Sequence, residues 1–189
     1  MNRTHKREDG LRCDIEPSSF EVMKRMLKEF KPQLIVEFGT LKGGFIKYMA
    51  EWYPEVPKYT VDAFWVLEKR EADFFRDNNV GVLITGQLFK NELLLPILLS
   101  LPLRKFLMCD NGRKTVEILK YAGYLRSGDI LAAHDWTSEI NITRVEEEVL
   151  QLFSKHPLEM DENIVDCRFF VRRFYEHENI CNPNRYVKE

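Results

Sequence analysis

A chain of 189 residues is long enough for one domain with a substantial core. Its 44% hydrophobic and 31% charged residues are typical of a globular protein, and its formal net charge of -2 provides no overall field for nucleic acid or an anionic membrane. No apolar run reaches roughly 18 residues, the N-terminus is too polar for a signal peptide, and the four cysteines show no C-x-x-C or zinc spacing. These features predict a cytoplasmic location.

The chain begins with a polar stretch, and we expect residues 1–16 to be a flexible segment ahead of a single domain at residues 17–189. Apolar residues at helical spacing predict a helix that opens at Pro17 and is stopped by Pro32. Its apolar positions are Phe20, Met23, Met26, Leu27 and Phe30. A short strand at residues 33–38 follows.

This strand leads into the motif Glu37-x-Gly39-x-x-x-Gly43, after which residues 44–52 predict a helix. The spacing differs from the dinucleotide fingerprint G-x-G-x-x-G, and no G-K-[ST] of a phosphate-binding loop follows. A carboxylate such as Glu37 repels phosphate but suits an ammonium group or a ribose hydroxyl. The pattern resembles motif I of class I S-adenosylmethionine (SAM) methyltransferases, although an ordinary buried strand with a glycine turn remains the alternative.

The second predicted strand, residues 58–62, ends in Asp62, which lies 25 positions after Glu37. An acid at about this offset can accept hydrogen bonds from both hydroxyls of a ribose, and a solvated Asp is the alternative. Residues 68–78 predict a charged helix and residues 81–85 a third strand, closed by Gly86 and Gln87, which could approach an adenine ring. A Leu-rich crossover helix is expected at residues 92–101.

The second half continues the alternation of strands and helices. Strands are predicted at residues 104–110 and 129–133, helices at 114–124 and 144–156, and two final strands at 158–160 and 168–174. Alternation predicts a parallel sheet with helices on both faces, whose ligands bind at the carboxyl ends of the strands. The residues expected at those ends are Glu37, Asp62, Gly86, Asp110 and Asp135.

A second group of polar residues follows the fourth and fifth strands. Asp110 and the pair His134-Asp135 are expected to meet, since these strands are neighbours in a doubly wound sheet. Asp110, His134 and Asp135 are the predicted metal ligands, for Mg²⁺ or Mn²⁺. The alternative is that Asp110 caps the next helix and His134 is a satisfied buried histidine.

Four stretches together resemble a known group: IVEFGTLKGG, YTVDAF, LMCDNGRK and LRSGDILAAHDW. They are similar to class I SAM-dependent methyltransferases related to the cephalosporin hydroxylase family. The resemblance implies a Rossmann-like, doubly wound, mostly parallel seven-stranded sheet with helices on both faces, whose last strand is antiparallel and lies between the fifth and sixth. The cofactor-binding residues then expected are Glu37, Phe38, Gly39, Thr40, Gly43, Asp62, Ala63, Gly86, Gln87 and Asp110.

The resemblance also implies catalytic residues. In metal-dependent relatives, and in catechol O-methyltransferase, acids after the fourth and fifth strands hold Mg²⁺, which corresponds to Asp110 and Asp135. The relatives usually carry a second acidic or amide ligand beside the latter, where this chain has His134 before Asp135 and Trp136 after it. The catalytic lysine of the catechol enzyme corresponds to Arg113, which is a poor base, so the neighbouring Lys114 is the expected base, with His134 and Asp135 as the other catalytic residues.

The sequence therefore predicts a SAM-dependent methyltransferase that acts on a hydroxyl of a sugar or other small metabolite, with metal assistance left open. The alternative is a nucleoside- or SAM-binding module without catalytic activity. An NAD-dependent oxidoreductase is disfavoured, because G-x-G-x-x-G is absent. A small-molecule substrate is expected, with no nucleic-acid or membrane partner, and a homo-oligomer is left open.

Overall fold

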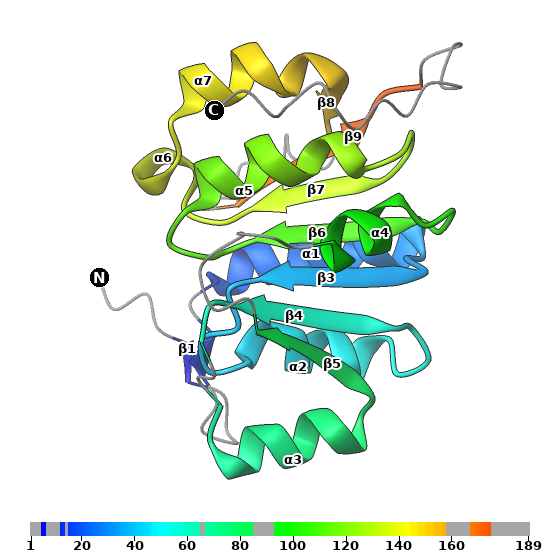
Figure 1. The fold of residues 1–189 in the computed structure, drawn as a ribbon, viewed down its shortest axis with the longest axis vertical. Helices are drawn as coiled ribbons and strands as arrows, with labels where there is room; N and C mark the ends of the chain where they lie inside the picture. Colours follow the sequence, from blue (N-terminus) through cyan, green and yellow to red (C-terminus); the bar gives the residue numbers. More distant parts are fainter. Residues whose placement is uncertain are drawn as a thin grey trace.

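The computed structural model describes residues 5–6, 12–13, 15–64, 67–84, 93–157 and 167–174. Its main sheet comprises β3 (Leu34–Phe38), β4 (Lys58–Asp62), β5 (Val80–Ile84), β6 (Lys105–Cys109), β7 (Ile130–Ala133), β8 (Phe153–Lys155) and β9 (Arg168–Arg172). The strand order is β5-β4-β3-β6-β7-β9-β8 (Figure 1). This confirms the predicted Rossmann-like arrangement, in which the last strand lies between the fifth and sixth strands of the sheet.

Strand direction also agrees with the prediction. The pairs β3–β4, β3–β6, β4–β5 and β6–β7 are parallel, whereas β9 runs antiparallel to both β7 and β8. Parallel neighbours carry their carboxyl ends to one edge of the sheet, so the residues that follow β3, β4, β6 and β7 are brought together.

Helices cover both faces of this sheet (Figure 1). They are α1 (Pro17–Phe30), α2 (Gly44–Trp52), α3 (Lys69–Asp77), α4 (Leu94–Ser100), α5 (Lys114–Tyr121), α6 (Trp136–Glu139) and α7 (Ile142–Glu148), with short 3₁₀ turns η1 (Ala122–Tyr124) and η2 (Leu150–Leu152). Side chains of α1, α2 and α3 share one buried cluster with alternate residues of the strands. Those of α4, α5, α6 and α7 share the other cluster, on the opposite face.

The sequence patterns explain most of these elements. Helix α1 carries Pro17 in its first turn and ends at Phe30. Lys31 caps it in the left-handed conformation, one residue before Pro32. The central strands β3 and β6 are buried at every position, as expected of parallel strands covered on both sides. In α4, Pro96 lies within the first turn, where a missing backbone N–H has no cost.

The predicted helix at residues 144–156 is wrong in its second half. Helix α7 ends at Glu148, the chain passes through η2, and residues 153–155 form the edge strand β8, paired with β9. Burial of Val145, Val149 and Phe153 satisfies a helical pattern equally well, so the apolar spacing could not distinguish the two structures. The strand predicted at residues 158–160 lies outside the described residues.

The N-terminal region contributes to the described structure in two places. Residues His5–Lys6 (β1) and Arg12–Cys13 (β2) form a small antiparallel pair that the sequence patterns did not predict. Ile15 is completely buried in the cluster that contains α1, so the packed part of the domain begins before Pro17. None of the helices in the described ranges combines the length and apolar character that crossing a bilayer requires.

Candidate functional site

Three backbone hydrogen bonds align the carboxyl ends of β4, β3, β6 and β7. The N–H of Gly39 donates to the carbonyl of Val61 at 2.8 Å, and the N–H of Asp110 donates to that of Phe38 at 2.8 Å. The N–H of His134 donates to the carbonyl of Cys109 at 3.2 Å. The residues just beyond these strands are therefore held side by side along one edge of the sheet, as the sequence predicted.

Gly39 makes the closest backbone approach at this edge. Its φ of +97° is strained for any residue with a Cβ. A Cβ added there would also overlap the carbonyl oxygen of Asp110 and lie 2.6 Å from its carbonyl carbon and 2.8 Å from the nitrogen of Asn111. Glycine at this position thus lets the turn after β3 pack directly against the turn after β6.

Gly43 is the last residue of the turn and directly precedes α2. It adopts φ +71° immediately before α2 and lies against the ring of Phe75, where a Cβ would clash. Its N–H donates to the carbonyl of Thr40 at 2.6 Å. The turn from residue 39 to 43 therefore delivers the N-terminus of α2, with its unpaired N–H groups, to the same edge of the sheet.

Asp62 connects the ends of β3 and β4. Its Oδ2 accepts the backbone N–H of Thr40 at 3.1 Å, and its Oδ1 accepts that of Ala63 at 2.7 Å. The carboxylate is half-buried, and these bonds fix its orientation beside the glycine turn. This is the position predicted for an acid that accepts hydrogen bonds from ribose hydroxyls.

Glu37 is almost completely buried and belongs to a short hydrogen-bond chain. The hydroxyl of Thr60 donates to Oε2 of Glu37 at 2.6 Å, so the 2.8 Å contact between the hydroxyls of Thr40 and Thr60 has Thr40 as its donor. Burial raises the pKa of Glu37 well above its usual value, against the hydrogen bond from Thr60, and the charges of Asp110 and Asp62 raise it further. The predicted acids Glu37, Asp62 and Asp110 thus act on one another at one site.

Of the four other predicted cofactor residues, two are buried near the turn and two lie outside the described part of the chain. Phe38 has a fully buried side chain packed on Tyr121, so only its backbone faces the edge of the sheet. Ala63 is buried directly after Asp62. Gly86 and Gln87 lie outside the described residues.

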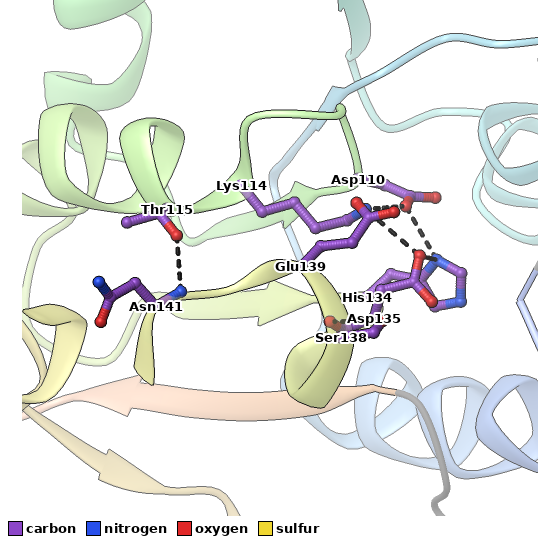
Figure 2. A network of polar contacts seen from close by, with 8 residues as sticks. All are labelled: Asp110, Lys114, Thr115, His134, Asp135, Ser138, Glu139 and Asn141. Carbon is purple, nitrogen blue, oxygen red and sulfur yellow. Dashed lines mark hydrogen bonds and ion pairs between the residues drawn. The ribbon is translucent and has the colours of Figure 1, made fainter. Parts of the chain in front are cut away.

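Asp110, His134 and Asp135 form a compact polar group (Figure 2). Nδ1 of His134 lies 2.9 Å from Oδ1 of Asp110 and 3.3 Å from Oδ2 of Asp135. Asp135 adopts a left-handed φ of 51°, which Asp tolerates better than most residues, and turns the chain into α6. Each of the three offers a ligand atom, and these atoms lie within 4.8 Å of one another, which fits the donor set of a divalent cation.

Lys114, the first residue of α5, extends into this group. Its Nζ lies 3.4 Å from Oδ1 of Asp110 and 3.4 Å from Oδ2 of Asp135. A third carboxylate, Glu139 of α6, lies closest, with Oε2 at 2.6 Å (Figure 2). The ammonium group is therefore surrounded by three carboxylates, although the side chain of Lys114 is only 3% exposed.

The neighbouring carboxylates raise the pKa of both His134 and Lys114. Burial lowers the pKa of His134, but the hydrogen bond and charge of Asp110, with the charge of Asp135, raise it above its usual value. Burial likewise lowers the pKa of Lys114, but the hydrogen bond to Glu139 and the three negative charges raise it overall. Both side chains are thus favoured as cations, and Lys114 donates hydrogen bonds in this arrangement; its role as a base stays a prediction.

Beneath this group lies Glu117, which is completely buried in α5. Neither carboxylate oxygen has a hydrogen-bond partner of good geometry among the described residues. Burial raises its pKa from 4.5 to about 9; the backbone N–H groups of Asn111 and Arg113 and the charge of Lys114 lower it only in part. Glu117 therefore holds a proton in the folded protein at neutral pH.

We expect Glu117→Gln to change the pH dependence of stability. Between pH 4.5 and about 9 the unfolded chain releases a proton that folded Glu117 retains, so this group makes the free energy of unfolding fall as pH rises. The wild type should lose up to about 2.7 kcal/mol relative to Glu117→Gln between pH 6 and pH 8. Urea unfolding at both pH values measures this difference; parallel pH profiles would contradict a neutral Glu117.

Three residues of the site were missed by the sequence analysis: Thr60, Glu117 and Glu139. Thr60 could have been found, because parallel pairing of β3 with β4 places it directly beside Glu37. No sequence pattern pointed to Glu139, since it belongs to helix α6, which was not predicted. Glu117 resembled any polar residue of a helix, and its burial depends on tertiary packing.

Comparison with known proteins supports the fold. No family model matches the chain, and no curated protein matches it in sequence. Its structure is similar to that of CmcI with S-adenosylhomocysteine (SAH), at 16% identity over 92% of this chain and 85% of that one, with a TM-score of 0.67. A structure of CmcI with Mg and SAM gives 17% identity over 90% and 77% of the two chains and a TM-score of 0.68.

A third similar structure is the O-methyltransferase TomG from Streptomyces achromogenes in complex with SAM. It has 11% identity over 85% of this chain and 82% of that one, with a TM-score of 0.59. The chain has the Rossmann-like fold of these O-methyltransferases. At such low identity the likeness concerns the fold, and the activity has to be argued from the residues of the site.

Proposed function

We propose that this protein is a SAM-dependent methyltransferase that methylates a hydroxyl oxygen of a small molecule, such as a sugar or another metabolite. The observation that carries the proposal is the position of Asp110. Its charge acts on Glu37, which with Asp62 and the turn at residues 39–43 forms a first group. Its carboxylate contacts His134, which with Asp135 and Lys114 forms a second group. The proposed cofactor site and the proposed acceptor site therefore lie side by side and share one residue.

The first group suits SAM in its chemistry. Asp62 would accept hydrogen bonds from the ribose hydroxyls. The buried Glu37 would pair with the ammonium group of the methionine part, whose positive charge would favour the ionised carboxylate that burial alone disfavours. Gly39, Thr40 and Gly43 form the turn that leaves room for the ligand, while Phe38 and Ala63 support it from within the core. Gly86 and Gln87 remain the proposed contacts of the adenine ring. The similar structures of CmcI and TomG contain SAH and SAM, respectively.

The second group suits the acceptor. We propose that Asp110, His134 and Asp135 hold a divalent cation, Mg²⁺ or Mn²⁺, because their ligand atoms converge within 4.8 Å. When bound, SAM supplies an activated methyl group and the cation supplies charge that favours an alkoxide. His134 would be neutral as a metal ligand, and the ammonium group of Lys114 adds positive charge that orients and stabilises a developing oxyanion. Lys114 is the proposed acceptor of the hydroxyl proton only once it has given up its own proton.

Calorimetry with SAM and SAH tests the proposal. The folded wild type should bind both, and Asp62→Asn should weaken binding about 10- to 100-fold, because it removes charge-assisted hydrogen bonds to the ribose. Asp77→Asn, which changes an exposed carboxylate at the end of α3, is the matched control and should bind like the wild type. Absence of binding by the folded wild type would overturn the proposal.

Turnover distinguishes the enzyme from a binding module. Release of SAH from SAM in the presence of a panel of hydroxylated sugars and phenols should depend on the acceptor. SAM binding without turnover on any acceptor would favour the non-catalytic alternative.

A further inference from the structure

Lys114 places a cation where a divalent ion would have to bind. Its Nζ lies 3.4 Å from Oδ1 of Asp110 and 3.4 Å from Oδ2 of Asp135, and both carboxylates belong to the proposed metal group. The ammonium group is held inside the site, because the side chain of Lys114 is 3% exposed. Carboxylate oxygens occupied by an ammonium group cannot offer the same lone pairs to a metal ion.

Repulsion between the ammonium group of Lys114 and a divalent ion also opposes binding of both at the same carboxylates. A divalent ion between Asp110 and Asp135 would lie within a few ångström of Nζ, where repulsion between like charges is strong in a largely buried site. Lys114 must therefore withdraw before the metal ion can bind both carboxylates. Glu139, which is outside the metal group, contacts Nζ at 2.6 Å and is 45% exposed (Figure 2), so it is the carboxylate left to pair with the ammonium group when Lys114 withdraws.

We propose that Lys114 is a resident cation that competes with a divalent metal ion for Asp110 and Asp135, and that Glu139 retains the ammonium group when the ion enters. This inference deepens the proposed function and rests on its metal site. The affinity of the protein for a metal ion then depends on Lys114 and Glu139 as well as on the metal ligands.

The competition is tested by measuring Mn²⁺ binding alone by calorimetry, without SAM or acceptor. Lys114→Met should bind Mn²⁺ at least about ten-fold more tightly than the wild type, because the competing charge is gone. Lys114→Gln is a second variant that keeps a polar side chain and should change affinity in the same direction. Lys120→Met removes the same charge from an exposed position of α5 and should leave Mn²⁺ affinity within about two-fold of the wild type.

The role of Glu139 is tested by a double-mutant cycle. Glu139→Gln in the wild type should weaken Mn²⁺ binding several-fold, since the ammonium group loses its alternative partner. In the Lys114→Met background the same substitution should have a clearly smaller effect. An equal effect in both backgrounds would show that Glu139 acts on the metal directly, and it would overturn the proposed coupling.

Other results would overturn the inference as a whole. One is Mn²⁺ binding by folded Lys114→Met and Lys114→Gln that is no tighter than that of the wild type. The other is the absence of Mn²⁺ binding by the wild type and all variants. Circular dichroism establishes that the variants are folded. SAM titration separates the two proposals: SAM binding without enhanced Mn²⁺ binding leaves the methyltransferase proposal standing, whereas loss of SAM binding in the wild type removes it.

Discussion

Replacing Gly39 with alanine should abolish detectable SAM binding and destabilise the protein by about 3 kcal/mol or more. The φ of +97° is unfavourable for alanine, and the new Cβ would overlap the backbone of Asp110 and Asn111. A backbone neighbour cannot rotate away as a flexible side chain can. Relief therefore requires the turns after β3 and β6 to separate, which moves Asp110 away from Glu37. Calorimetry and urea unfolding measure the two effects.

Two other glycines are matched controls for this substitution. Gly128 has a similar φ of +85°, but a Cβ there would only approach Phe174 at 3.5 Å. Gly128→Ala should thus show the conformational cost alone, about 1–2 kcal/mol, with unchanged SAM affinity. Gly112 lies near the site with open space around it, and Gly112→Ala should bind SAM normally. Normal SAM binding by Gly39→Ala would contradict the proposed cofactor turn.

Replacing Asp129 with asparagine should destabilise the protein by about 3–5 kcal/mol, because it leaves the buried ammonium group of Lys105 without its counter-ion. Nζ of Lys105 lies 2.8 Å from Oδ2 of Asp129, and both side chains are almost completely buried. The carboxylate also accepts the backbone N–H groups of Lys105 and Arg126. This pair ties the start of β6 to the start of β7, at the end of the sheet opposite the site.

Urea unfolding tests the Asp129 prediction, and the exposed pair Arg144–Glu148 provides the control. Glu148→Gln should cost less than about 0.5 kcal/mol, since solvent screens an exposed i,i+4 pair. Replacing both Lys105 and Asp129 by apolar residues should recover much of the loss, because no buried charge then remains unpaired. SAM affinity should stay unchanged throughout. A cost below about 1 kcal/mol for Asp129→Asn would mean that the pair contributes little.

The site could be predicted in part because its main acids occupy repeated local positions. Glu37 is the last residue but one of a predicted strand, and Asp62 and Asp110 end two others. The rule that parallel strands share a carboxyl edge was therefore sufficient to bring them together. The contacts of Lys114 could not be predicted in the same way. Its closest partner, Glu139, lies 25 residues away in a helix of four residues that has no sequence signature.

The amino-acid sequence by itself determined the order of strands and helices from α1 to β7, the glycine turn and the acids at the strand ends. These features depend on side-chain periodicity and on backbone preferences that act over a few residues. Only the tertiary structure decided that residues 153–155 form a strand, that Glu117 is buried and that Lys114 lies among three carboxylates. Those outcomes depend on which distant segments pack together, since pairing with β9 and exclusion of water change the free energy of a residue without changing its local pattern.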